Sequence, residues 1–230
     1  MCNIHHAVAA LPQDVYVRAG SALLQGELLV PENPAGIVLF LHGAGSSRHS
    51  PRDRAIAAEL HKNHFATFLL GLLTLPEETR DLETGEYRRS VRMLARRIIS
   101  VTEALGRDPA VRGLPVSFVA TGTGAAAALL AAAEKPALAG AIVCRGGRPD
   151  LAGAALGRVA APTLLVVGSE DHDTLRCNHE SLGQMRCEKQ LRLISGAGHL
   201  FEEKGAVEEL EALIVDWLQR HLHADASCPC

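Results

Sequence analysis

Asp171 and His199 are an acid and an imidazole that follow two apolar runs in the last third of the chain. Asp171 comes directly after the run at 162–168, and His199 lies in the glycine-flanked segment "SGAGHLF" (195–201). A carboxylate that accepts a hydrogen bond from an imidazole orients the ring, which can then take a proton from a nucleophile. The two residues are therefore a candidate acid–base pair.

A tight glycine turn precedes this pair along the chain. The stretch "FVATGTGAAAALL" (118–130) is typical of a strand, a sharp turn and an alanine-rich helix. In a nucleophile elbow the pattern is small-x-nucleophile-x-small, because the turn is sharp and the helix packs close to the strand. Ala120 and Gly124 supply the small residues, but the central residue, Gly122, has no attacking atom. The pattern predicts an elbow that lacks its nucleophile.

Another glycine-rich turn, "HGAGSS" (42–47), follows an apolar run at 36–41. Small residues in such a turn expose backbone N–H groups, which can hold a developing oxyanion. An ordinary connection between a strand and a helix is the alternative interpretation.

The elements that must position these residues alternate between strands and helices. Alternation of this kind indicates βαβ units and a mainly parallel, doubly wound sheet with helices on both faces. The predicted strands are 23–30, 36–41, 65–72, 115–121, 139–144, 162–168 and 189–195, and the predicted helices are 51–63, 87–105, 124–133, one near 177–186 and a last one that includes Val207 to Leu218. Ligands of such sheets bind at the carboxyl ends of the strands, which is where the candidate residues lie.

The domain organisation is predicted to be simple. We expect a flexible N-terminus (1–11), one domain (12–222) and a flexible cysteine-containing tail (223–230). The acidic segment 73–87 is predicted to be a long loop, and long loops in compact domains often act as lids or binding loops.

Composition excludes several classes of function. The chain has 230 residues, of which 47% are apolar, and a formal net charge of −3, which argues against nucleic acid as a partner. No window is long and apolar enough for a membrane span or a signal peptide, so we expect a cytoplasmic protein with its six cysteines reduced.

Two further sets of residues are candidate ligand sites. Arg88, Arg92 and Arg96 have the spacing of one helix face, where an anion-binding role is possible but a solvated face is the favoured interpretation. The paired histidines, such as His61 and His64, have no third ligand at zinc-like spacing, so no metal and no cofactor is expected.

Taken together, these motifs resemble the α/β-hydrolase superfamily and, within it, the dienelactone-hydrolase-like family. The order elbow, acid, histidine is the order of that superfamily, and the resemblance covers about residues 12–222. The segments that carry it are "LHGAGSSRHSPR" (41–52), "TGTGAAAALLAAAEKP" (121–136), "CRGGRPDLAG" (144–153), "PTLLVVGSEDH" (162–172) and "GAGHLFEEKGAVEEL" (196–210).

The resemblance implies an esterase or lactonase that acts on a small carboxylic ester, lactone or thioester. The family's serine or cysteine falls on Gly122, while Asp171 and His199 match the acid and the base. Backbone N–H groups near Ala44 and of Thr123 would form the oxyanion hole. We also expect His42, Gly43 and Arg145, which stand at strand ends, to line the substrate pocket.

Three outcomes of the missing nucleophile stay open at this point. Thr121 or Thr123 could replace it, although the neighbours of the central elbow residue point elsewhere. His199 and Asp171 could instead activate water directly, with impaired catalysis. The third outcome is a non-catalytic protein that keeps the fold to bind a small molecule or to regulate another protein.

Overall fold

A computed structural model describes residues 11–42 and 50–222, and all its strands form one sheet. The strands are β1 (Gln13–Ala19), β2 (Ala22–Leu29), β3 (Gly36–His42), β4 (Phe65–Leu70), β5 (Val116–Gly122), β6 (Ala141–Gly147), β7 (Thr163–Gly168) and β8 (Lys189–Ile194). Their order in the eight-stranded sheet is β1-β2-β4-β3-β5-β6-β7-β8. β1 and β2 form an antiparallel hairpin at one edge, and β2 also pairs antiparallel with β4. The strands β3 to β8 run parallel to one another.

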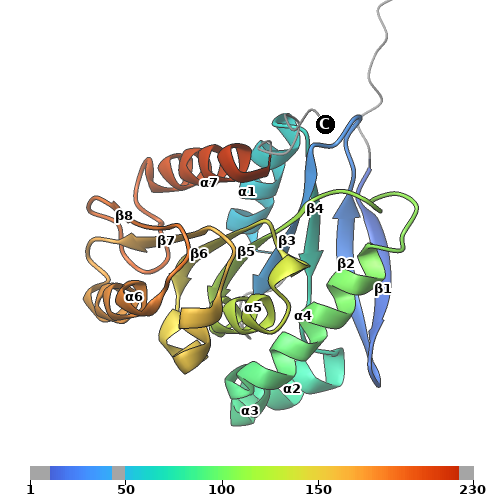
Figure 1. Ribbon diagram of the computed structural model, residues 1–230, viewed down its shortest axis with the longest axis horizontal. Helices are drawn as coiled ribbons and strands as arrows, with labels where there is room; N and C mark the ends of the chain where they lie inside the picture. The colour runs from blue at the N-terminus through green and yellow to red at the C-terminus, as the bar shows by residue number, and fades with distance from the viewer. Residues whose placement is uncertain (1–10, 43–49, 223–230) are drawn as a thin grey trace, which may run out of the picture.

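Helices cover both faces of this sheet, as Figure 1 shows. The α-helices are α1 (Pro51–Lys62), α2 (Leu75–Thr84), α3 (Glu86–Arg89), α4 (Val91–Leu105), α5 (Thr123–Glu134), α6 (His172–Gln184) and α7 (Ala206–Leu222), and the 3-10 segments are η1 (Pro136–Leu138) and η2 (Pro149–Arg158). α1 and α7 pack on one face, and α4, α5 and α6 lie on the other. The predicted single-domain α/β architecture is confirmed.

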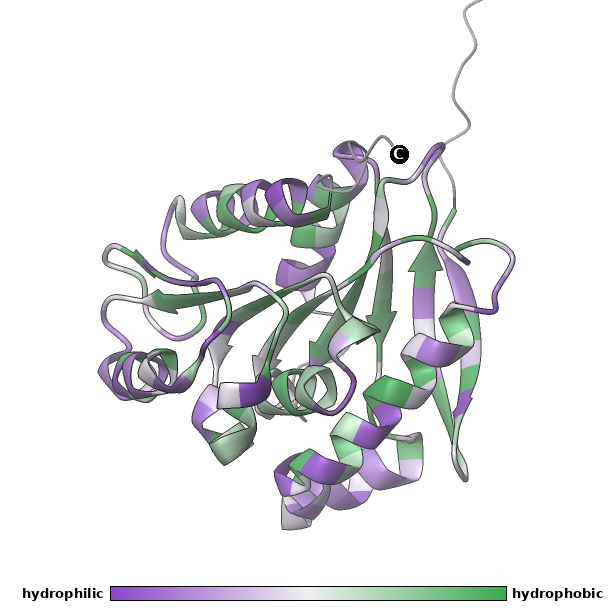
Figure 2. Ribbon diagram, viewed as in Figure 1, coloured by the Kyte–Doolittle hydropathy of each residue, from purple (hydrophilic) through white to green (hydrophobic). Residues whose placement is uncertain are grey.

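Burial explains why the central strands are continuous apolar runs. Every residue of β3, β4, β6 and β7 is buried, because helices cover both sides, whereas β1 and β2 alternate between buried and more exposed residues. Figure 2 shows the apolar strands between helices whose outer surfaces are polar. No helix within the described ranges is both long and apolar enough to span a bilayer.

The segment 73–87 was predicted wrongly as a loop, because it contains α2 and α3. Thr74 precedes α2, and its backbone N–H donates to the Glu77 carboxylate at 2.8 Å. Gly85 ends the helix with a left-handed backbone (φ 61°). The leucines of the helix are Leu75 and Leu82, and both are exposed. With so few apolar side chains, the segment gives too weak a periodic pattern to predict a helix.

The start of α6 also differs from the prediction. The helix begins at His172, five residues earlier than expected, because Asp171 caps its N-terminus. Its buried face is polar, made by Thr174, Asn178 and Ser181, and a search for apolar periodicity therefore misses its first turns.

Candidate functional site

The candidate site lies where the sheet changes its direction of winding. From β3 the chain moves to β4 on one side and then crosses to β5 on the other. Such a switch point leaves a crevice at the carboxyl ends of the two central strands, which here end at His42 and Gly122. The predicted site residues are therefore expected around these ends.

Gly122 forms a strained turn between β5 and α5. Its backbone has φ 54° and ψ −132°, a conformation that glycine adopts far more readily than other residues. Its carbonyl oxygen accepts a hydrogen bond from the Arg148 N–H at 3.0 Å, which ties the turn to the end of β6. A Cβ atom built on Gly122 would meet no heavy atom of residues 11–42 and 50–222 within 4 Å. The turn is therefore sharp, and no described residue fills the space above its centre.

Asp171 and His199 form the hydrogen-bonded pair that the sequence predicts. The Asp171 Oδ2 and His199 Nδ1 atoms are 2.6 Å apart, and Asp171 also accepts a hydrogen bond from the Thr174 N–H at 3.3 Å. Burial raises the pKa of Asp171, but the hydrogen bonds from Thr174 and His199 outweigh this effect and leave its pKa below the ordinary value. Asp171 is therefore ionised at neutral pH and holds Nδ1 of the ring, so that Nε2 faces away from it.

Two glycines bring His199 and the Gly122 turn to the same edge of the sheet. A Cβ on Gly146 would lie 3.7 Å from Cε1 of His199, and one on Gly147 would lie 2.5 Å from Cβ of Ala125 in α5. Gly147 is also the register partner of Gly122 across β5 and β6. The imidazole therefore lies close to the strand end next to the turn. A side chain at 147 would push β6 and α5 apart, whereas a Cβ at 146 would meet His199 only at ordinary contact distance.

The oxyanion donors are described only in part. Thr123 is the first residue of α5, so its backbone N–H is one of those that a helix leaves unpaired at its N-terminus. The hydroxyl of Thr123 is buried without a hydrogen-bond partner in the described part of the chain. Gly43 and Ala44, the other predicted members of this region, lie outside the described residues.

Arg145 does not line an open pocket as expected. It is 3% exposed, and its guanidinium donates to the carboxylate of Asp53, which is fully buried in the first turn of α1. Arg145 is buried because α1 covers this end of β6, and the sequence pattern does not show where α1 packs. Arg145 is thus part of a buried ion pair and offers no surface that a substrate could contact directly.

His42 belongs to the same buried cluster. His42, Thr121 and Arg145 are register neighbours on β3, β5 and β6, so they point to one face of the sheet. The His42 Nδ1 atom lies 3.5 Å from Asp53 Oδ2, and neither ring nitrogen has a hydrogen bond among the described residues. Burial lowers the pKa of His42 despite the nearby Asp53, so the ring is neutral at pH 7. The sequence does not indicate this role of Asp53, because an acid in the first turn of a helix is favoured there by the helix dipole alone.

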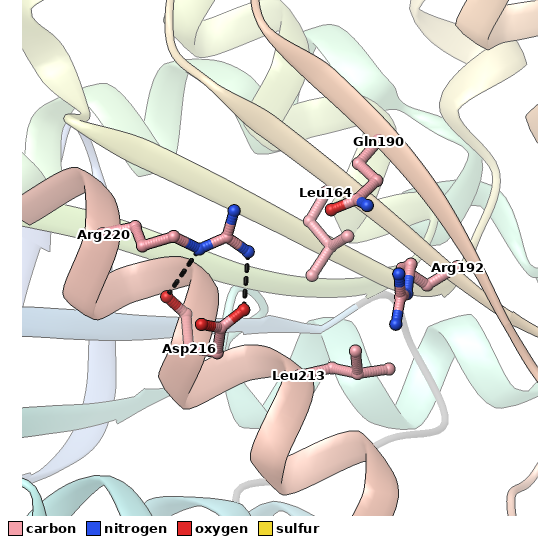
Figure 3. A pocket seen from close by; sticks show the side chains of 6 residues that line it. All are labelled: Leu164, Gln190, Arg192, Leu213, Asp216 and Arg220. Atoms are coloured by element: carbon pink, nitrogen blue, oxygen red, sulfur yellow. Dashed lines mark hydrogen bonds and ion pairs between the residues drawn. The ribbon is translucent and has the colours of Figure 1, made fainter.

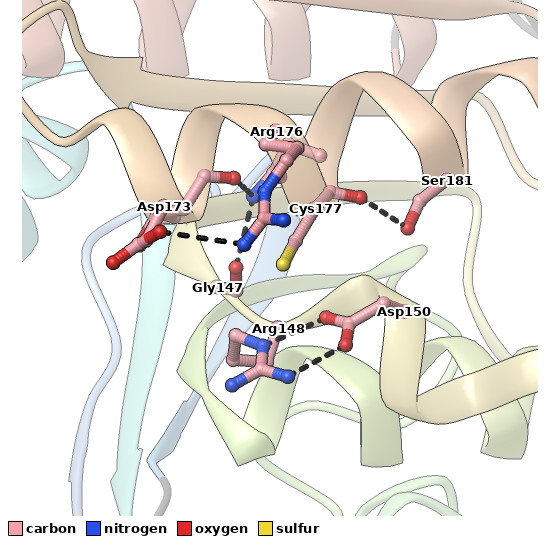
Figure 4. Close-up of polar contacts among 9 residues, drawn as sticks. Gly147, Arg148, Asp150, Asp173, Arg176, Cys177 and Ser181 are labelled. Atoms are coloured by element: carbon pink, nitrogen blue, oxygen red, sulfur yellow. Dashed lines mark hydrogen bonds and ion pairs between the residues drawn. The ribbon is translucent and has the colours of Figure 1, made fainter.

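A second set of contacts holds the chain after β6, as Figure 4 shows. Asn178 of α6 donates to the Gly147 carbonyl oxygen at 3.0 Å. Arg148 donates to both carboxylate oxygens of Asp150, at 2.8 and 2.7 Å. These contacts hold Gly147 and Arg148 in place, and the Arg148 N–H hydrogen-bonds Gly122, which helps to maintain the strained turn. Within 11–42 and 50–222 no group of three or more His, Cys, Asp or Glu residues is placed to hold a metal ion.

Comparison with known proteins gives the family. No protein-family model matches the chain. A crystal structure of dienelactone hydrolase from Anabaena variabilis is 43% identical, covers 93% of this chain and 99% of its own, and superimposes with a TM-score of 0.89. The chain belongs to the dienelactone-hydrolase-like α/β-hydrolases.

More distant structures share the fold of this dienelactone-hydrolase-like chain. The dienelactone hydrolase-like promiscuous phosphotriesterase P91 from metagenomic libraries has 20% identity, a TM-score of 0.73 and coverage of 93% of this chain and 99% of its own. Est1E from Butyrivibrio proteoclasticus has 13% identity, a TM-score of 0.75 and coverage of 91% and 99%.

The curated relatives are longer proteins. Two proteins from strains of Mycobacterium tuberculosis, both named "Putative phosphoribosyl transferase", are 46% identical over 210 residues. The match covers 91% of this chain but 46% of each relative. The chain therefore spans about half the length of the curated relatives it matches.

Proposed function

We propose that this chain binds a small carboxylic ester, lactone or thioester at the Gly122 turn and hydrolyses it slowly without a covalent intermediate. The observation that supports this proposal is the 2.6 Å hydrogen bond between Asp171 and His199, which is kept although Gly122 has no attacking atom. An imidazole that a carboxylate orients close to this turn could act as a general base for water.

The reaction would proceed in two steps. Nε2 of His199 takes a proton from a water molecule as the water oxygen attacks the carbonyl carbon of the ester. The resulting oxyanion accepts a hydrogen bond from the Thr123 N–H, while Asp171 stabilises the imidazolium. The imidazolium then returns its proton to the leaving alkoxide as the carbon–oxygen bond breaks, giving an acid and an alcohol.

The rate is expected to be low because the step that a nucleophile normally accelerates is missing. In serine hydrolases, removal of the catalytic serine leaves only about 10³- to 10⁴-fold acceleration over water, from the oxyanion hole and substrate binding. No described residue occupies the position of a Cβ on Gly122, so a serine fits among them, although this backbone conformation costs roughly 1–3 kcal/mol for a residue with a side chain.

Hydrolysis of p-nitrophenyl acetate by the purified chain tests this proposal. We expect slow hydrolysis by the wild type, its loss in His199→Ala, and an increase of about a hundredfold or more in Gly122→Ser. His179→Ala, which changes an exposed histidine of α6, is the matched control and should not alter the rate. A wild-type rate equal to that of His199→Ala would exclude a catalytic role for the imidazole.

A non-catalytic binding protein is the second candidate. The space above Gly122 that the described residues leave free supports it, since a ligand atom could occupy the position of the missing side chain. In that case Gly122→Ser would weaken ligand binding while the wild type stays inactive towards esters.

The name of the longer relatives concerns a different activity. We propose that any phosphoribosyl transfer by those proteins resides in the half that this chain does not match, because the matched half has the α/β-hydrolase fold. A truncated relative that contains only the matched half should then lack transferase activity.

A further inference from the structure

A groove of about 670 Å³ lies between the β1–β2 turn and the first half of α4. The polar side chains that line it are Ser21, Ser90, Arg92, Arg96, Arg97 and Ser100. Leu70 pairs with Gly26 where β4 ends, so the β1–β2 turn projects beyond the carboxyl ends of the parallel strands. The groove therefore opens on the same edge of the sheet as the Gly122 turn, several strands away from it.

The groove carries an excess of positive charge. Three arginines line it, and none of the described residues that line it is acidic. Arg97 is neutralised from outside the groove by Glu77, with hydrogen bonds of 2.6 and 2.7 Å. Arg92 and Arg96 are exposed and form no ion pair within the part of the chain that the structure describes. Since they are four residues apart on α4, both reach the same side of the helix.

The N-terminus of α4 adds to this positive potential. Ser90 is the N-cap residue and lines the groove, and the first turn of the helix contains no acidic residue. The unpaired N–H groups and the dipole of a 15-residue helix favour a bound anion at this end.

Two other grooves provide a comparison within the same molecule. In the groove of Figure 3, Arg220 is paired with Asp216 at 2.6 Å, which leaves Arg192 as the single unpaired arginine. The other groove is lined by four acidic residues and no arginine or lysine: Glu59, Glu208, Glu211 and Asp216. Of these three grooves, the groove beside α4 alone is lined by two arginines without an ion pair among the described residues.

We propose that this groove binds the phosphate group of a small phosphomonoester, at a site separate from the Gly122 turn. A phosphomonoester carries nearly two negative charges at pH 7, which match the two uncompensated arginines. The hydroxyls of Ser21, Ser90 and Ser100 supply further donors, and Met93 and Ile99 offer apolar surface for the rest of the molecule. A carboxylate has a single charge and fewer acceptor oxygens, so it should bind more weakly.

Titration calorimetry with glycerol 3-phosphate at low salt tests the proposal. We expect binding in the millimolar range or tighter, and a loss of at least about tenfold in the double variant Arg92→Gln/Arg96→Gln. Arg192→Gln is the matched control, because it removes an exposed, unpaired arginine from another groove. Glycerol and acetate should bind detectably more weakly than the phosphate ester. Circular dichroism of each variant verifies that the fold is retained.

Three results would overturn the proposal. The first is the absence of binding by glycerol 3-phosphate to the folded wild type. The second is an equal loss of affinity in the Arg192→Gln control, which would indicate non-specific attraction. The third is binding of an acidic peptide in the groove without binding of the phosphate ester, which would assign the surface to a protein partner.

Discussion

His42 is a histidine that the fold keeps neutral, and this has a consequence for stability. The ring is 5% exposed at the end of β3 and faces a carboxylate that is already bound to Arg145. Burial lowers its pKa below the ordinary value of 6.5. The unfolded chain therefore binds a proton at His42 at a higher pH than the folded chain does, and the free energy of unfolding falls as the pH drops below about 6.5.

His42→Gln should remove this part of the pH dependence. We expect the free energy of unfolding of the variant to change less than that of the wild type when the pH falls from 7.5 to 5.5, because glutamine does not titrate. Urea unfolding at several pH values measures the difference. His179→Gln alters an exposed histidine and should keep the wild-type slope. Identical slopes for His42→Gln and the wild type would show that His42 is protonated equally in both states.

The sequence was sufficient to predict a contact between two residues when both follow the carboxyl ends of strands in the same sheet. Asp171 and His199 could be paired because the carboxyl ends of parallel strands share one edge, and the structure places them in hydrogen-bond contact. The Asp53–Arg145 pair could not be predicted in this way. It joins a helix to a strand 92 positions away, and only the packing of α1 over the sheet brings the two charges together.

Among the elements, α2 depends on α4 more than on its own sequence. α2 has exposed leucines, and it is fixed by Arg97 of α4, which donates to Glu77 and to the Leu72 carbonyl oxygen at 2.8 Å. Glu77 also accepts from the Thr74 N–H that precedes the helix. One carboxylate thus links the start of α2 to the middle of α4. The sequence shows each of these residues but not their contact, which explains why 73–87 was expected to be a loop.

Glu77→Gln should therefore destabilise the protein at neutral pH by about 2 kcal/mol, since Arg97 is left nearly buried without its counter-charge. The hydrogen bond from Arg97 lowers the pKa of Glu77, so the contribution is fully present above its ordinary pKa of 4.5. It disappears as the pH falls through the lower folded-state pKa. Thermal or urea unfolding of both proteins at pH 7 and in acid measures this difference.

Glu83→Gln is the control for that comparison, because Glu83 is an exposed acid of the same helix. It should change stability by less than about 0.5 kcal/mol at either pH. An equal effect of the two substitutions would mean that a general loss of negative charge, and not the Arg97 contact, determines the stability of α2.

At the scale of the whole molecule, one sheet separates two apolar clusters that cannot form independently. The cluster under α1 and α7 and the cluster under α4, α5 and α6 use alternate residues of the same strands. In β5, for example, Phe118 belongs to one cluster and Val119 to the other. The sequence predicted this arrangement from strands that are apolar throughout, because such strands must be covered on both faces.

The two clusters should therefore unfold in a single transition. Trp217 of α7 is the only tryptophan of the chain, is 1% exposed and packs in the cluster under α1 and α7, so its fluorescence reports on that face. Far-UV circular dichroism reports on all helices, most of which lie on the opposite face. Urea curves recorded by the two signals should coincide in midpoint and slope, since loss of either cluster exposes the shared strands. A fluorescence midpoint at lower urea than the dichroism midpoint would instead show that α1 and α7 detach while the remaining layers stay folded.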